Sequence, residues 1–189
     1  MFKSMRLLPN TLIILAFLFA AVTASALSGI PTSYSVAGKQ LVLNGAGTRT
    51  KFIISVYNAG LYLPKKSNDA AQIIAADEPM AMRIKIVSGF ASAAKMKNAI
   101  KEGFHKSTGG NTAPIQPQID QLLKSAFSGE VNKGDTFDLV YIPGTGTLVL
   151  KNNKTLTTIK GLPFKQALFG IWLSDNPVQA SLKKRLLGQ

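Results

Sequence analysis

One arginine stands inside the segment of this chain that otherwise reads most clearly as buried β-sheet, and this combination restricts the fold. Arg49 lies within the stretch Asn44–Leu63, in which apolar and β-branched residues fall on both parities. From Arg49 onward, such a pattern predicts a central strand covered on both faces. A buried guanidinium needs an anionic partner, because an unpaired buried charge costs several kcal/mol. A ligand carboxylate or a substrate oxyanion would serve. The alternative is that Arg49 caps the strand in solvent.

The N-terminus has the regions of a secretory signal peptide. Lys3 and Arg6 make its start positive, Thr11–Thr23 is a continuous apolar run, and small residues follow it. The apolar run is shorter than the ~20 residues that a spanning helix needs, which favours a cleaved peptide over a permanent anchor. We therefore predict a signal peptide at residues 1–26, one domain at residues 27–189, and a periplasmic location.

Composition excludes several chemistries. Cysteine is absent, so the chain can form no disulfide, thiolate metal site or cysteine nucleophile. The 22 Lys and Arg residues outnumber the nine Asp and Glu residues, and the formal net charge is +13. In an exported protein whose lysines are spread along the chain, this charge favours anionic lipid surfaces or anionic small molecules over nucleic acid. The other interpretation is that the charge only keeps the protein soluble.

The remaining periodicity predicts an α+β domain with an antiparallel sheet and helices gathered mainly on one face. Helices are expected to begin after the capping residues Asp69 and Ser92, and near Pro117, Pro163 and Pro177. The segment at residues 80–87 alternates apolar with basic residues, which predicts a strand with one face in water. The other predicted strands span residues 39–44, 49–63, 136–142, 147–151 and 155–160.

Few side chains suggest a catalytic or metal centre. His105 is the only histidine and stands among charged residues near a predicted helix end. It is interpreted as a solvated residue, with an axial haem ligand as the alternative. The glycine-rich turn Pro143–Thr147 lies between two strands, with no helix N-terminus behind it to hold a phosphate. No carboxylate pair suited to acid–base chemistry is visible. No metal and no cofactor is predicted.

Three separated segments carry a specific pattern in a fixed order. They read NGAGTR with FIISVYNAGLYLP, then KGDTFDLVYIPGTGT, and finally FGIWLSDNPVQASLKKRLLG. These segments resemble the chalcone isomerase superfamily, in particular its bacterial, exported, chalcone isomerase-like members. The resemblance implies an open-faced β-sandwich in which a long sheet and a layer of helices enclose an apolar cleft. It also implies a role for Arg49, since the family arginine steadies an anionic flavonoid oxygen in the plant enzymes and pairs with the ligand carboxylate in fatty-acid-binding relatives.

The chain departs from the catalytic members in its proton-handling groups. The plant enzymes present a tyrosine from the helical half of the cleft, whereas no tyrosine occurs here between residues 87 and 139. Asn111 falls near the expected position, and Tyr57 replaces the threonine of the catalytic strand. Tyr57 is either a core aromatic or a hydroxyl donor. On one straight strand it would lie roughly 26 Å from Arg49, so the two share a site only if the chain folds back near residues 50–51.

Functions of different class follow from these residues. As a binding protein, the domain would hold a fatty acid or a similar apolar anion, with Arg49 as counter-ion. As an enzyme, it would close a ring in an intramolecular lyase reaction, with Arg49 stabilising the oxyanion and Tyr57 as the candidate acid. Non-catalytic binding is preferred, because the helical tyrosine is missing; an envelope interaction protein without ligand is the third alternative. The candidate ligand-binding residues are Arg49, Ile53, Tyr57, Met96, Phe104, Asn111 and Phe164.

Overall fold

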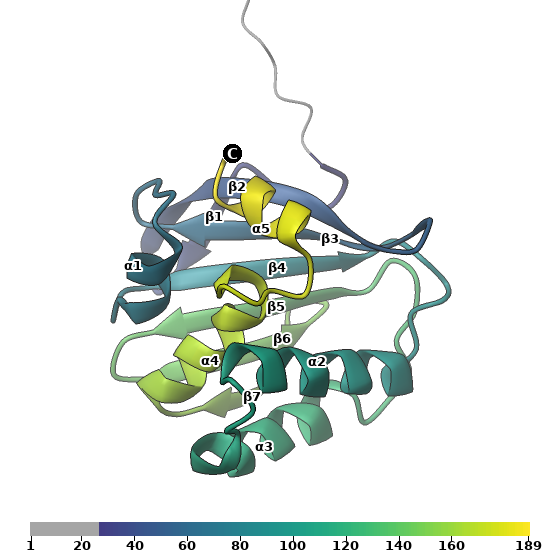
Figure 1. Cartoon of the computed structure of the whole chain (residues 1–189). Coiled ribbons are helices and arrows are strands. Elements are labelled where there is room, and N and C mark those ends of the chain that lie inside the picture. Colours follow the sequence, from purple (N-terminus) through teal and green to yellow (C-terminus); the bar gives the residue numbers. More distant parts are fainter. Residues whose placement is uncertain (1–26) are drawn as a thin grey trace, which may run out of the picture.

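A seven-stranded antiparallel sheet, in which each strand pairs with its neighbours in the sequence, forms the frame of the molecule (Figure 1). The computed structural model describes residues 27–189, so the predicted signal peptide lies outside the described residues. The strands are β1 (Ser33–Val36), β2 (Lys39–Lys51), β3 (Ile54–Leu63), β4 (Met80–Ile86), β5 (Thr136–Ile142), β6 (Gly146–Lys151) and β7 (Lys154–Ile159).

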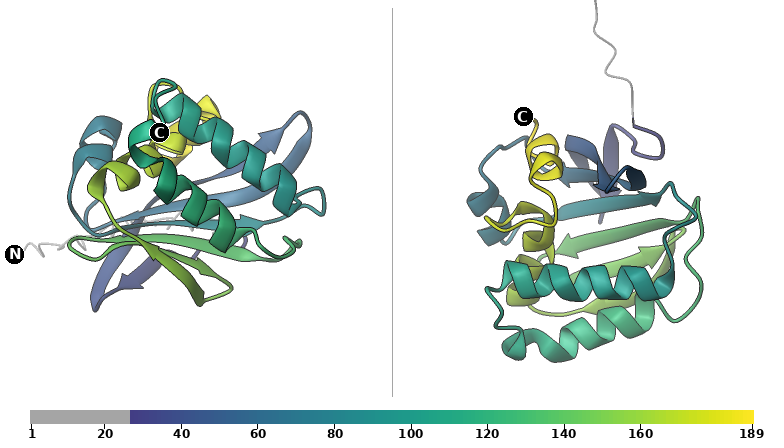
Figure 2. Two further views of the ribbon diagram at one scale, coloured as in Figure 1. Left: turned by 90° about the horizontal axis from the view of Figure 1, so that it is seen from below. Right: turned by 45° about the vertical axis from the view of Figure 1, so that its right-hand side comes forward.

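Helices cover one face of this curled sheet (Figure 2). They are α1 (Ala70–Ala75), α2 (Ala93–Ser107), the short 3-10 helix η1 (Ala113–Ile115), α3 (Gln116–Ala126), α4 (Leu162–Leu173) and α5 (Ala180–Leu186). Helix α4 packs against α1 and α2, while α3 packs on β6 and β7 and α5 packs on β2. The predicted α+β arrangement is thereby confirmed. Within residues 27–189, no helix combines the length and hydrophobicity needed to cross a membrane.

Helix starts follow the capping signals closely. The Asp69 side chain accepts a hydrogen bond from the backbone N–H of Gln72 at 2.9 Å, and Ser92 accepts one from the backbone N–H of Lys95 at 3.4 Å. The C-terminal helix is an exception, because it begins at Ala180 and not at Pro177.

The main core lies between the sheet and the helices. Helix α4 is buried on nearly all sides and contributes Phe164, Phe169 and Trp172, which are at most 1% exposed. A smaller cluster on the opposite face of the sheet includes Ile30 and Tyr62. Strand β3 is therefore covered on both faces, as predicted for this segment.

The stretch predicted as one strand from Arg49 to Leu63 is instead a hairpin. Strand β2 continues to Lys51, the chain reverses at Phe52 and Ile53, and β3 returns beside it. Phe52 has a φ of 53°, a left-handed backbone that large side chains rarely adopt. Tight hairpin turns are usually marked by Gly, Asn or Asp, so this apolar turn carries no sequence signal for a reversal.

The alternation along β4 predicted that its basic residues face open water, but Arg83 does not. Arg83 donates from Nε and Nη2 to the two carboxylate oxygens of Asp138 at 2.7 and 3.0 Å, and Asp138 is 1% exposed. The guanidinium carbon also lies 5.0 Å from the centre of the Tyr34 ring. Strand β1 therefore shields this face, which alternation along β4 alone cannot reveal.

Candidate functional site

A cavity of about 320 Å³ opens between the sheet and helix α2. Val56 of β3 and Ile84 of β4 line its sheet side, Met96 and Ile100 of α2 line its helical side, and Trp172 of α4 adds an indole ring. The volume lies at the lower end of the range of about 300–1,000 Å³ that is usual for small-molecule sites. These walls suit a ligand with an apolar body.

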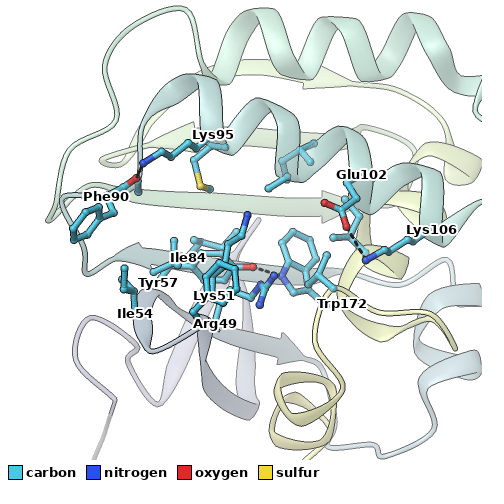
Figure 3. A pocket seen from close by; sticks show the side chains of 18 residues that line it. Arg49, Lys51, Ile54, Tyr57, Ile84, Phe90, Lys95, Glu102, Lys106 and Trp172 are labelled. Atoms are coloured by element: carbon cyan, nitrogen blue, oxygen red, sulfur yellow. Dashed lines mark hydrogen bonds and ion pairs between the residues drawn. The ribbon is translucent and has the colours of Figure 1, made fainter.

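Arg49 and Tyr57 meet at this cavity because of the hairpin. They are direct partners in the β2–β3 register, and both line the cavity. Residues directly opposite in an antiparallel pair project from the same face of the sheet. The chain therefore does fold back, with its turn at residues 52–53, and Figure 3 shows the two side chains close together.

The guanidinium of Arg49 is held by neutral oxygens. Its Nη1 donates to Oε1 of Gln179 at 3.0 Å and to the backbone carbonyl of Thr50. The same Gln179 oxygen accepts the backbone N–H of Thr50 at 2.9 Å. None of the ion pairs within residues 27–189 includes Arg49. The arginine is thus oriented without being neutralised, and its remaining N–H groups can donate to an anion.

Tyr57 supplies a buried, neutral hydroxyl. Its oxygen accepts a hydrogen bond from Nε1 of Trp172 at 2.9 Å, shown as a dashed line in Figure 3. Burial raises the pKa of Tyr57, and the Trp172 hydrogen bond and the charge of Arg49 oppose this shift. The phenol therefore keeps its proton at neutral pH. Because its oxygen already accepts one hydrogen bond, its O–H can donate to a ligand oxygen beside Arg49.

Basic side chains surround the mouth of the cavity. Lys51, Lys95 and Lys106 line it together with a single acid, Glu102. The hydrogen bond from Lys106, at 2.8 Å, lowers the pKa of Glu102, and the charges of Lys106, Lys51 and Arg49 act in the same direction. One carboxylate among these cations leaves the mouth with a net positive charge, which attracts anionic ligands.

Among the predicted ligand-binding residues, Arg49, Tyr57 and Met96 line the cavity. Ile53 does not, because it occupies the hairpin tip and is 96% exposed. Its neighbour Ile54 lines the cavity instead. The predicted straight strand placed Ile53 on the wrong side of a reversal that the sequence does not signal.

Phe104, Phe164 and Asn111 also lie outside the cavity, and their predicted role as cleft residues is wrong. Phe104 and Phe164 are fully buried, with ring centres 5.7 Å apart. Helix α4 packs against α2 here, and the two rings fill the space between the helices. Asn111 is exposed in the loop that follows α2.

His105 takes no part in the cavity either. It is exposed in the last turn of α2, where a histidine also interacts favourably with the helix dipole. Within the described part of the chain, no three His, Cys, Asp or Glu side chains are grouped so that they could hold a metal ion.

Among the residues that sequence reasoning missed, Trp172 and Gln179 are the two that hydrogen-bond to Tyr57 and Arg49. A usable signal exists for Trp172, since a buried indole N–H needs an acceptor and tyrosine is a common one. No signal exists for Gln179, which reaches Arg49 across 130 positions of the chain.

We expect Tyr57→Phe to lower the free energy of unfolding by about 1 to 3 kcal/mol, because the buried N–H of Trp172 loses its acceptor. Urea denaturation measures the change. In a Trp172→Phe background the same substitution should cost clearly less, because no donor is then left unpaired. Equal costs in both backgrounds would show that the hydrogen bond contributes nothing to stability.

Comparison with known proteins gives one family match and similar solved structures. A family model described as chalcone isomerase-like matches residues 23–188. No curated protein sequence matches the chain. Among solved structures, a fatty-acid binding protein of Arabidopsis thaliana is similar, with a TM-score of 0.67 and 15% sequence identity. The alignment covers 84% of this chain and 90% of that protein, and at this identity the similarity shows a common fold.

Proposed function

Because the chain belongs to the chalcone isomerase-like family, we propose that its cavity binds a fatty acid or a similar apolar carboxylate without converting it. The observation that carries this proposal is the pair of donors at the cavity, the un-neutralised guanidinium of Arg49 and the neutral hydroxyl of Tyr57. Both can donate to one carboxylate, while the apolar walls take the hydrocarbon chain. The fatty-acid binding protein that shares this fold supports the same assignment.

The site favours binding over ring closure. A lyase reaction needs a group that moves a proton opposite Arg49, but the α2 wall offers Met96, Ala99 and Ile100 there. At the mouth, Glu102 is paired with Lys106 and stays ionised. The buried phenol of Tyr57 resists losing its proton, so it is a poor general acid for ring closure.

We also propose that binding takes place in the periplasm. This location depends on the signal peptide predicted from residues 1–26. An exported carrier would need a cavity that shields the hydrocarbon chain of its ligand from water, which the apolar walls provide.

We expect Arg49→Ala to weaken binding of decanoic acid by about 1.5 to 3 kcal/mol and to leave binding of its methyl ester nearly unchanged. The reason is that a charge-assisted hydrogen bond is lost only with the acid. Titration calorimetry with both ligands, in the absence of lipid, measures the difference.

Lys51→Ala is the matched control, since Lys51 also lines the mouth but is exposed on the hairpin. It removes the same charge but should weaken binding of decanoic acid much less, because exposed charges are screened by water. Equal losses for acid and ester in Arg49→Ala would contradict the role of Arg49 as counter-ion.

A further inference from the structure

Three exposed hydrophobic side chains lie together at the mouth of the cavity. Phe52 is 90% exposed, Ile53 is 96% exposed and Phe90 is 64% exposed. We call them the tip patch. Phe52 and Phe90 both line the cavity, and Figure 1 shows the β2–β3 turn and the β4–α2 loop at the same end of the sheet. Single exposed hydrophobic residues are ordinary, but a group on two loops beside a cavity marks an interaction surface.

The backbone at the tip patch is strained in a way that packing within residues 27–189 does not explain. Phe52 holds a φ of 53°, which is costly for a bulky side chain. An Asn-Gly turn would relieve this strain and remove the exposed side chains of Phe52 and Ile53. Since the Phe52 and Ile53 side chains gain little from burial in the free protein, we look for their partner outside it.

The charges beside the tip patch indicate what kind of partner this is. Lys51 directly precedes Phe52 and is exposed. Lys95 is exposed too; its Nζ lies 3.1 Å from the backbone oxygen of Phe90 and 5.7 Å from the centre of its ring. Aromatic and aliphatic tips with adjacent lysines fit a bilayer surface, where the apolar groups enter the headgroup boundary and the lysines contact lipid phosphates.

A second copy of the chain fits this surface less well. Pairing two tip patches would bring the lysines of both copies together, in a chain whose formal net charge is already +13. An anionic lipid surface has the opposite charge and accepts the same apolar groups.

We propose that the tip patch docks on an anionic lipid bilayer, so that the mouth of the cavity opens at the membrane surface. Docking in this orientation brings Arg49 and Lys51 toward the headgroups and lets an apolar ligand enter without crossing open water. This surface function goes beyond ligand binding and holds for whichever ligand the cavity accepts.

The test uses Ile53→Trp in the full chain, with fluorescence as the readout. Ile53 is chosen because it belongs to the tip patch but does not line the cavity. The natural Trp172 is 1% exposed but also lines the cavity, so its emission is recorded in the wild-type protein with the same vesicles and subtracted. Residues 11–23 are apolar and could bind lipid themselves, so the readout must be local to position 53.

With phosphatidylglycerol vesicles, we expect the emission of the indole introduced by Ile53→Trp to shift to shorter wavelength. Vesicles of phosphatidylcholine alone should give no shift, and high salt should reverse it. Adding Lys51→Glu and Lys95→Glu should lower the apparent vesicle affinity by about tenfold or more, because each lysine near an anionic bilayer contributes to binding.

Val42→Trp is the matched control. Val42 is the other large hydrophobic residue exposed within residues 27–189, at 38%, and it pairs with Leu63, far along β2 from the tip. The indole introduced there should show no vesicle-dependent shift.

Three results would overturn the proposal. One is no shift for Ile53→Trp with phosphatidylglycerol vesicles, and another is an equal shift for Val42→Trp. The third is a shift that develops without vesicles as protein concentration rises, which would indicate self-association. Calorimetry with decanoic acid in lipid-free buffer reports separately on the cavity, so either conclusion can fail alone.

Discussion

Replacing Gly45 with alanine is expected to lower the free energy of unfolding by about 3 kcal/mol. A Cβ atom at this position would lie 2.1 Å from the backbone oxygen of Arg185 and 2.7 Å from that of Leu186. Both oxygens belong to helix α5 and cannot rotate away as a side chain could. Helix α5 would have to move off β2, although Asn44 Nδ2 holds it there by donating to the Leu186 oxygen at 2.8 Å.

Two other glycines provide controls for this prediction. A Cβ at Gly47 would meet side-chain atoms of Leu182 and Arg185 at 2.9 and 3.0 Å, so Gly47→Ala should cost less. A Cβ at Gly89 would meet nothing within 4 Å, so Gly89→Ala should be nearly neutral. Urea denaturation ranks the three variants. If Gly45→Ala were as stable as Gly89→Ala, the close contact between α5 and β2 would be wrong.

Gly45→Ala should also weaken carboxylate binding. Gln179, which orients Arg49, is the residue immediately before α5. Displacing this helix moves the Gln179 oxygen away from the guanidinium. The NGAGTR segment thus combines two tasks in one strand, since its first glycine admits α5 and its arginine reaches the cavity.

The fold class could be read from the sequence because it depends on local patterns. Alternation over residues 136–142 and the caps at Asp69 and Ser92 are signals within a few residues of the chain, and the structure follows them. The hairpin turn at Phe52 and Ile53 could not be read in this way. Its apolar residues resemble the strand interior, and only pairing between β2 and β3 reveals the reversal.

The site could be predicted only in part from the sequence, for a similar reason. Arg49 and Tyr57 stand out as a charge and a hydroxyl in an apolar run, and the structure places them side by side. Whether Met96 or Phe104 faces the cavity depends on where α4 packs along α2, because Met96, Ile100 and Phe104 recur every four residues and share one helix face. Sequence periodicity identifies that face but not the part of it that stays open.

Lys165 shows a limit of prediction from the sequence and also a sequence signal that was not used. It is 0% exposed within α4, a helix so apolar that it must be buried on all sides. A lysine inside such a helix needs partners. The structure supplies three carbonyl oxygens at the end of α1, those of Ile73, Ile74 and Ala76, at 3.0, 2.8 and 2.6 Å from Nζ. They are groups that α1 itself leaves unpaired.

Lys165→Met should therefore lower the free energy of unfolding at pH 7 by about 2 to 3 kcal/mol. Methionine can fill the space, but the three carbonyls lose their donor. This loss outweighs the desolvation cost that the variant avoids because it buries no charged group. Lys160→Met is the matched control, since Lys160 is exposed and should change stability little.

The pH dependence of stability should also change in Lys165→Met. Burial lowers the pKa of Lys165 to about 8, and the charges of Asp77 and Glu78 offset this only in part. Between about pH 8 and pH 10 the unfolded chain still holds the proton that the folded chain has released. Raising the pH in this window therefore stabilises the wild-type fold, by up to about 2 kcal/mol.

Above about pH 10 the trend should reverse, because burial raises the pKa of Tyr34 and Tyr141 to about 12 and the unfolded chain then ionises first. Urea denaturation from pH 7 to pH 11 should thus show a stability maximum near pH 10 in the wild type and in Lys160→Met. The rise from pH 8 to pH 10 should be absent in Lys165→Met, whereas the fall above pH 10 should remain. A rise of the same size in Lys165→Met would assign the effect to other groups, and would mean that Lys165 stays charged against the carbonyls of α1 throughout this range.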